Sequence, residues 1–75
     1  MNLCITSNAK NKEIKRLITL DRFLSPRYNH RVSSAIMRLN QFINNKMPEA
    51  DLQIQSSDQH RIDIYAGAIL IAYYQ

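Results

Sequence analysis

The side chains of this sequence that could do chemistry are mostly cations, and their chemistry is the binding of anions. Residues 1–46 hold nine basic residues against two acidic ones, Glu13 and Asp21, which gives a net charge of +7. From residue 47 on, one basic residue stands against four acidic ones, a net charge of −3, so that the whole chain carries +4. A charge asymmetry of this size bears on association and partners rather than on fold. It predicts an anionic partner for the first 46 residues.

Arginines recur at helical spacing in the middle of the chain. Arg27, Arg31 and Arg38 fall on one side of a helix, opposite its apolar residues. A guanidinium offers paired N–H donors that fit a phosphate or a carboxylate, and nucleic-acid binding relies on such phosphate contacts. The alternative is a solvated face that keeps a small apolar protein in solution. The candidate binding residues are Lys12, Lys15, Arg16, Arg22, Arg27, Arg31, Arg38 and Lys46.

Groups suited to catalysis or metal binding are sparse. Asp58 and His60 share one short segment, but Cys4, His30 and Glu49 lack the spacing of a metal site. No pattern positions Cys4 beside a histidine as a nucleophile pair, and a single glycine leaves no Gly-rich phosphate loop. We therefore expect a protein that is not an enzyme, with no metal and no cofactor.

The length and composition are those of one small globular domain spanning residues 1–75. The chain is 45% hydrophobic, and Cys4 is its only cysteine, so an intrachain disulfide is impossible. A domain this small is near the lower limit for folding alone, which favours association with another subunit. A lone cysteine fits a reducing compartment. The N-terminus does not resemble a signal peptide, and the apolar run 64–74 is too short to span a membrane. We expect a soluble, cytoplasmic protein without membrane contact.

Two helices are predicted in the first part, after a short strand over residues 3–6. Ser7 and Asn8 are good capping residues for a helix over about 9–23. Its apolar positions are Ile14, Leu17, Ile18 and Leu24. Ser25 and Pro26 then begin a second helix over about 26–46, because proline suits the first helical position. Its apolar residues follow the i, i+3, i+4, i+7 pattern of an amphipathic helix: Tyr28, Val32, Ala35, Ile36, Leu39, Phe42, Ile43 and Met47.

The last part changes to the period of strands. Residues 52–55 and 61–65 alternate between apolar and polar, and the turn-rich segment 56–60 separates them, which predicts a hairpin with a five-residue loop. Residues 69–74 are rich in Ile and Tyr, which favours a third strand. A competing interpretation is a three-helix domain, since Ser56 and Gln59 could form a capping box before apolar residues at helical spacing. We favour an α+β domain whose long apolar C-terminal strand lies in a sheet packed on the second helix.

The parity of the last apolar residues predicts an irregularity. Ile62 and Ile64 are even-numbered, whereas the large residues after them are odd-numbered, so a continuous strand would place them on opposite faces. One extra residue near Gly67, a β-bulge, would return them to one face. The alternative is that another subunit buries the second face. Tyrosines are common at interfaces, and we expect a homodimer. The candidate interface residues are Tyr65, Ile69, Ile71, Tyr73 and Tyr74.

Two classes of function fit these features. The first is a small non-enzymatic regulatory or accessory protein that binds nucleic acid through its basic helical face, although no known DNA- or RNA-binding signature is present. The second is an adaptor or inhibitor, of the kind found on mobile elements, whose basic face docks on an acidic protein surface. Both need the same cations on the surface.

Overall fold

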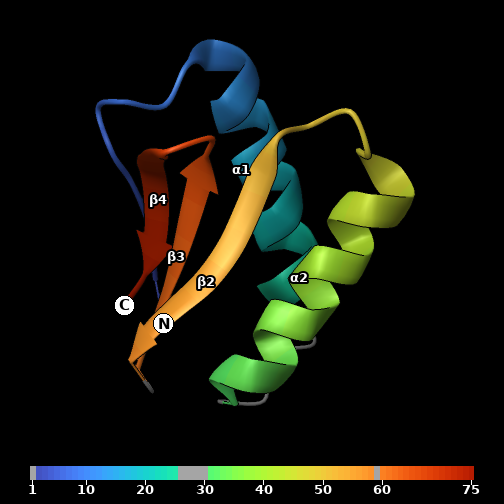
Figure 1. Cartoon of the computed structure of the whole chain (residues 1–75), viewed down its shortest axis with the longest axis vertical. Coiled ribbons are helices and arrows are strands. Elements are labelled where there is room, and N and C mark those ends of the chain that lie inside the picture. The colour runs from blue at the N-terminus through green and yellow to red at the C-terminus, as the bar shows by residue number, and fades with distance from the viewer. Residues whose placement is uncertain (1, 26–30, 59) are drawn as a thin grey trace.

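The protein folds as an α+β domain in which a four-stranded sheet is covered on one face by helices (Figure 1). The computed structural model describes residues 2–25, 31–58 and 60–75. Its elements are β1 (Leu3–Ile5), α1 (Asn11–Leu24), α2 (Val32–Lys46), β2 (Leu52–Asp58), β3 (Arg61–Ala66) and β4 (Ile69–Tyr74). This arrangement confirms the predicted α+β class and excludes the three-helix alternative, because strands occupy the segment on which the third helix depended.

The sheet is antiparallel throughout, with the strand order β1-β4-β3-β2. The last three strands form a meander, and β1 joins it at the edge of β4. The pairing of β1 with β4 extends to the chain ends, where the Asn2 N–H donates to the Gln75 carbonyl (3.0 Å) and the Gln75 N–H donates to the Asn2 carbonyl (3.2 Å). The first and last described residues therefore lie side by side, as the N and C labels of Figure 1 show.

The core lies between one face of the sheet and the helices. Register places the even-numbered residues of β2, β3 and the end of β4 on the same face, since Ile54 pairs with Ile64, and Ile64 with Ala72. These residues are buried together with those of α1 and α2, as expected for a sheet with one covered face. The largest fully buried side chains are Leu17, Leu20, Leu39, Ile62, Ile64 and Ile71.

Helix α1 is shorter at its start than predicted and faces the core with a narrower stripe. The Asn8 and Ala9 N–H groups bond the Thr6 hydroxyl (3.2 Å) and carbonyl (3.3 Å), a turn that keeps residues 7–9 out of the helix. Lys10, not Ser7 or Asn8, is the N-cap, and its N–H donates to Glu13 Oε1 at 2.8 Å. The prediction that Ile18 faces the core is wrong, because this side chain is 43% exposed. Ile18 lies on the helix beside the buried stripe and not within it. That stripe consists of Leu17, Leu20 and Leu24.

Helix α2 packs with the apolar side that the sequence indicated. Ala35, Leu39 and Ile43 are buried, and Val32, Ile36 and Phe42 are partly buried against the core. Helix α2 begins at Val32, and Arg31, its N-cap, has an extended backbone (φ −104°, ψ 110°), so the predicted helix is not continuous through Arg31. Residues 26–30, including the predicted helix position of Tyr28, lie outside the described residues.

The irregularity in the sheet is a bulge at Ile71, not at Gly67. Ile64 pairs with Ala72 and Tyr65 with Leu70, so that Ile71 is the extra residue. Ile71 and Ala72 are 1% and 0% exposed, so the bulge turns two successive side chains into the core. Gly67 instead has a φ of +62° in the two-residue connection between β3 and β4. The predicted loop over 56–60 was also too long, because β2 continues until Asp58 pairs with Arg61.

Candidate anion-binding surface

The predicted cations lie on the helices, with their side chains toward solvent. Lys12, Lys15 and Arg22 on α1 are exposed, and Arg16 is half-buried. On the second helix, Arg31 at the N-cap, Arg38 in the middle and Lys46 in the last turn are exposed. Arg27 lies outside the described residues. The surface formed by these described cations is called the basic helical surface below.

Within the described residues, none of these cations forms an ion pair with a carboxylate. The ion pair found there joins Arg61 and Asp63 on the sheet. The two acidic residues of α1 serve other groups: Glu13 accepts the Lys10 N–H, and Asp21 accepts the Tyr74 hydroxyl. Helix α2 contains no acidic residue. The positive charge of the basic helical surface is therefore not neutralised by direct contacts within the described chain.

The basic helical surface divides into two parts. Lys12 and Arg16 line a small pocket of about 290 Å³ that also contains Glu49 and Asp51, whose carboxylates lower the local positive potential. The remaining cations lie outside this pocket, so the structure does not bring all predicted residues to one site. Lys46 lies at the C-terminal end of α2, where a cation is favoured by the helix dipole.

An aromatic contact joins the two helices close in sequence to two of the arginines. The rings of Phe23 and Phe42 stack with centroids 4.3 Å apart and an interplanar angle of 25°. Arg22 directly precedes Phe23, and Arg38 lies one turn before Phe42. The stack thus joins the last turn of α1, which carries Arg22, to the turn of α2 that follows Arg38. Asp21, the acidic residue directly before Arg22, accepts a hydrogen bond from the Tyr74 hydroxyl.

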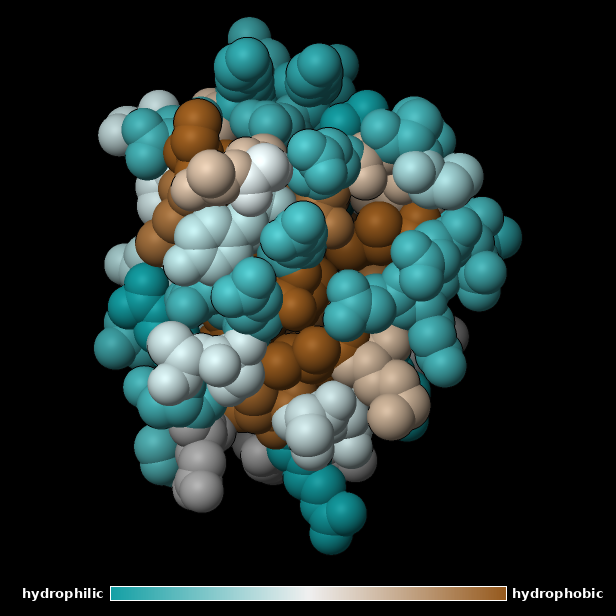
Figure 2. Space-filling model, in the orientation of Figure 1, coloured by the Kyte–Doolittle hydropathy of each residue, from teal (hydrophilic) through white to brown (hydrophobic). Residues whose placement is uncertain are grey.

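A groove that the sequence did not indicate lies between α2 and the end of β2. It has a volume of about 520 Å³ and is lined by Arg31, Val32, Ser33, Ile36, Ser56, Ser57 and Asp58. Figure 2 shows hydrophobic atoms visible between the sheet and α2, framed by hydrophilic side chains. Val32 and Ile36 are only partly buried, although their spacing fits core positions, so the pattern of α2 did not indicate the groove.

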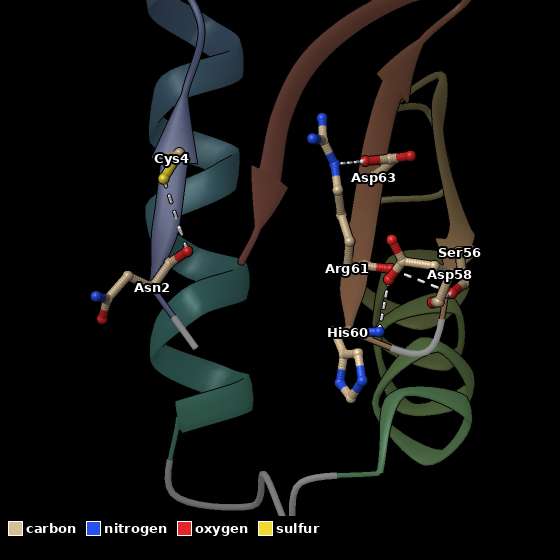
Figure 3. Close-up of polar contacts among 7 residues, drawn as sticks. All are labelled: Asn2, Cys4, Ser56, Asp58, His60, Arg61 and Asp63. Atoms are coloured by element: carbon tan, nitrogen blue, oxygen red, sulfur yellow. Dashed lines mark hydrogen bonds and ion pairs between the residues drawn. The ribbon is translucent and has the colours of Figure 1, made fainter.

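The open face of the sheet carries a compact polar cluster (Figure 3). Arg61 Nε donates to Asp63 Oδ1 at 2.7 Å, and the guanidinium carbon of Arg61 lies 4.1 Å from the centre of the Tyr73 ring. The hydrogen bond to Asp63 raises the pKa of the Arg61 guanidinium above its usual value. Asp63 is 6% exposed although it lies on the open face. Because the two charges compensate each other, this cluster is not part of the basic helical surface.

The described candidates for catalytic chemistry lie in two separate places, and His30 lies outside the described residues. His60 donates its backbone N–H to Asp58 Oδ1 at 2.7 Å, so this carboxylate closes a turn. The Ser56 hydroxyl donates to the Asp58 and Arg61 carbonyls in the same turn (Figure 3). Cys4 has its Sγ 3.9 Å from the Asn2 carbonyl. Within the described residues, no three His, Cys, Asp or Glu side chains lie together as a metal site would need.

The candidate interface residues occupy three different places. Ile71 and Tyr74 are buried in the core of the single chain, which removes them from the surface. Tyr65 and Tyr73 are half-buried on the open face, where Tyr73 is covered by Arg61. Ile69 is 54% exposed at the start of β4. The bulge at Ile71 causes this division, because it separates residues that share a parity in the sequence.

Comparisons of this chain with protein-family models, with curated proteins and with solved structures found no match. Over the residues described, neither helix has the length and apolar character needed to cross a lipid bilayer.

Proposed function

We propose that this protein is a non-enzymatic regulatory or accessory protein that binds nucleic acid through the basic helical surface. The observation that carries the proposal is the set of exposed cations without intrachain carboxylate partners within 4 Å in the described residues. Side-chain cations left unpaired in this way can neutralise phosphates and so release the counterions condensed on the nucleic acid, which is the main source of non-specific affinity. We place this activity in the cytoplasm, in keeping with the lone cysteine.

Arg22 and Arg38 are the residues on which the binding depends most strongly. Their neighbourhoods are held together by the Phe23–Phe42 stack, and both side chains are exposed. Lys12 and Arg16 contribute less, because Glu49 and Asp51 share their pocket. Backbone phosphates carry no sequence information, so this surface predicts binding without strong sequence preference.

The test is a salt titration of binding to duplex DNA and to single-stranded RNA. We expect Arg22→Gln/Arg38→Gln to weaken binding and to reduce the slope of log affinity against log salt by roughly one unit for each phosphate that is no longer neutralised. The matched control is Asn2→Asp/Gln75→Glu, which changes the net charge by the same amount at exposed positions beside the opposite edge of the sheet from β2. The control should keep a slope close to that of the wild type.

Equal affinities of the double arginine variant and the wild type at every salt concentration would overturn the role of these residues. Failure of the wild type to bind either nucleic acid at low salt would overturn the proposal as a whole. That second result, combined with recovery of an acidic protein that no longer binds the arginine variant, would assign the same surface to a protein partner.

A further inference from the structure

Strand β2 ends the sheet on the side of α2, and its outer edge pairs with no other strand in the described residues (Figure 1). An unpaired strand edge presents a row of N–H and C=O groups that can bond another strand. The opposite edge of the sheet, β1, has only three residues, whereas β2 has seven. The longer free edge is therefore the place where a further strand can be added.

The regular first part of β2 has little that would prevent such an addition. Natural edge strands are commonly protected by lysine, by proline or by a bulge. Residues 52–57 contain no basic residue and no proline, and the only charge of the strand is Asp58 at its end. A register shift follows Gln55, so the regular part of the edge is 52–55. Within it, Leu52 and Ile54 are buried, whereas Gln53 and Gln55 are exposed.

The groove between α2 and β2 lies beside this edge. Its apolar wall is formed by Val32 and Ile36, which are only partly buried within the chain. A strand added to β2 would run beside this groove and cover hydrophobic surface that Figure 2 shows open to solvent. Backbone pairing and apolar burial thus favour the same addition.

We propose that the added strand is the β2 strand of a second copy of this chain, paired antiparallel about a two-fold axis. An antiparallel edge is complementary to itself, and a two-fold axis satisfies both copies equally. Charge favours contact through β2 over contact through the helices. Two basic helical surfaces in contact would repel each other, whereas the β2 edge is almost uncharged. The antiparallel direction also brings the end of β2 that lies near Arg31 toward Glu49 and Asp51 of the partner copy.

The faces of the strands fix the register. Residues on the helix side must pair with residues on the helix side, so even-numbered positions lie opposite even-numbered positions. Within the regular segment this places Leu52 opposite the partner's Ile54 and Gln53 opposite the partner's Gln53. The two-fold axis then passes beside Gln53, whose exposed side chain lies on the open face with Tyr65.

This dimer would be one continuous sheet with the helices of both copies on the same side. The two basic helical surfaces would then face the same way and double the cationic area available to one polyanion. That consequence rests on the function proposed above, whereas the association of the two copies does not.

The test places charges at the axis. In Gln53→Lys and Gln53→Glu, like charges would lie directly opposite each other, and we expect the dimer dissociation constant to rise by roughly fivefold or more. An equimolar mixture of the two variants places opposite charges together and should restore dimers. Gln41→Lys and Gln41→Glu are the matched controls, because Gln41 is an exposed glutamine that helical spacing places opposite the buried side of α2. Sedimentation equilibrium of the full chain, without nucleic acid, measures all five proteins and the mixture.

A wild-type chain that stays monomeric up to high micromolar concentration would overturn this proposal. It would also be overturned if the Gln53 variants dimerise as tightly as the Gln41 variants, since the copies would then meet elsewhere. Loss of dimers in both Gln53 variants, without recovery in the mixture, would contradict the register. Because the readout contains no nucleic acid, each of these results is independent of the salt titration that tests the proposed function.

Discussion

The hydroxyl of Tyr74 donates a hydrogen bond of 2.9 Å to Oδ1 of Asp21, which joins the last strand to the first helix. Tyr74 is 3% exposed, and burial followed by this hydrogen bond raises the pKa of its phenol above the usual value. The folded chain therefore holds the phenolic proton more tightly than the unfolded chain does. Removal of the hydroxyl would leave the carboxylate of Asp21 without this donor.

Tyr74→Phe is expected to lower the free energy of unfolding by about 1–3 kcal/mol at neutral pH, the range for a hydrogen bond to a charged group. The stability that Tyr74 contributes is fully present below its unfolded pKa of 10.0 and is lost as the pH rises above it, because the folded pKa is the higher one. Thermal unfolding between about pH 8 and pH 11 measures this loss. A Tyr74→Phe variant with the same alkaline fall in stability as the wild type would contradict it, and Tyr65→Phe is the control.

Neighbouring residues of α2 should respond very differently to truncation. Leu39→Ala is expected to destabilise the fold by about 2–5 kcal/mol, because Leu39 is fully buried in the core. Arg38→Ala should change stability by less than about 0.5 kcal/mol, because its side chain is exposed. Denaturant unfolding of both variants tests the orientation of the helix. Similar losses for the two would mean that the buried side of α2 is assigned incorrectly.

Thr6 should stabilise the bulge in β4. Its hydroxyl lies 3.0 Å from the Leu70 carbonyl and 3.1 Å from the Ile71 carbonyl, and its N–H donates to the Ile71 carbonyl at 2.9 Å. Thr6→Val keeps the side-chain shape but loses the hydroxyl, with an expected cost of about 1 kcal/mol. Thr6→Ser keeps the hydroxyl and should lose less. Amide hydrogen exchange of β1 and β4 should accelerate in the valine variant, and unchanged protection would show that the backbone bond alone holds the bulge.

Gly67 should be sensitive to substitution for a reason that lies in the backbone. Its φ of +62° is costly for other residues, whereas a Cβ there would meet its nearest neighbour, Asp51 Oδ2, at an ordinary 3.8 Å. Gly67→Ala is therefore expected to cost about 1–2 kcal/mol, and Gly67→Asn less, because asparagine adopts this conformation more easily. Thermal melts of both variants measure the difference. Equal losses would point to crowding by Asp51 instead of backbone conformation.

The elements were predictable where the pattern is local and long. The apolar spacing of α2 identified its buried side, and alternation identified β2 and β3, because burial on one face imposes these periods directly. The parity change after Ile64 correctly indicated an irregular residue. Its place at Ile71 was not predictable, because it depends on pairing with β3 and on the bonds from Thr6, which is remote in sequence.

The candidate site was predictable in its charges but not in its arrangement. Exposure of the cations follows from helical spacing. That Arg16 shares a pocket with carboxylates, unlike the other described arginines of the helices, depends on where the fold places Glu49 and Asp51. The pair Arg61 and Asp63 had a readable signal, since residues two apart on a strand share a face. The groove beside β2 had none, because it depends on how the start of α2 lies against the end of β2 in the folded chain.

The pairing of β1 with β4 bears on how the chain folds during synthesis. Of the four strands, β1 is synthesised first, but its strand partner in the described structure, β4, is synthesised last. Strand β1 therefore stays without a strand partner until β4 has been synthesised. Pairing between strands so far apart in sequence also slows folding, because a long loop must close before the contact can form. Ribosome-bound chains that stop before Ile69 would accordingly expose Leu3 and Ile5 to chaperones and proteases, whereas released chains would not.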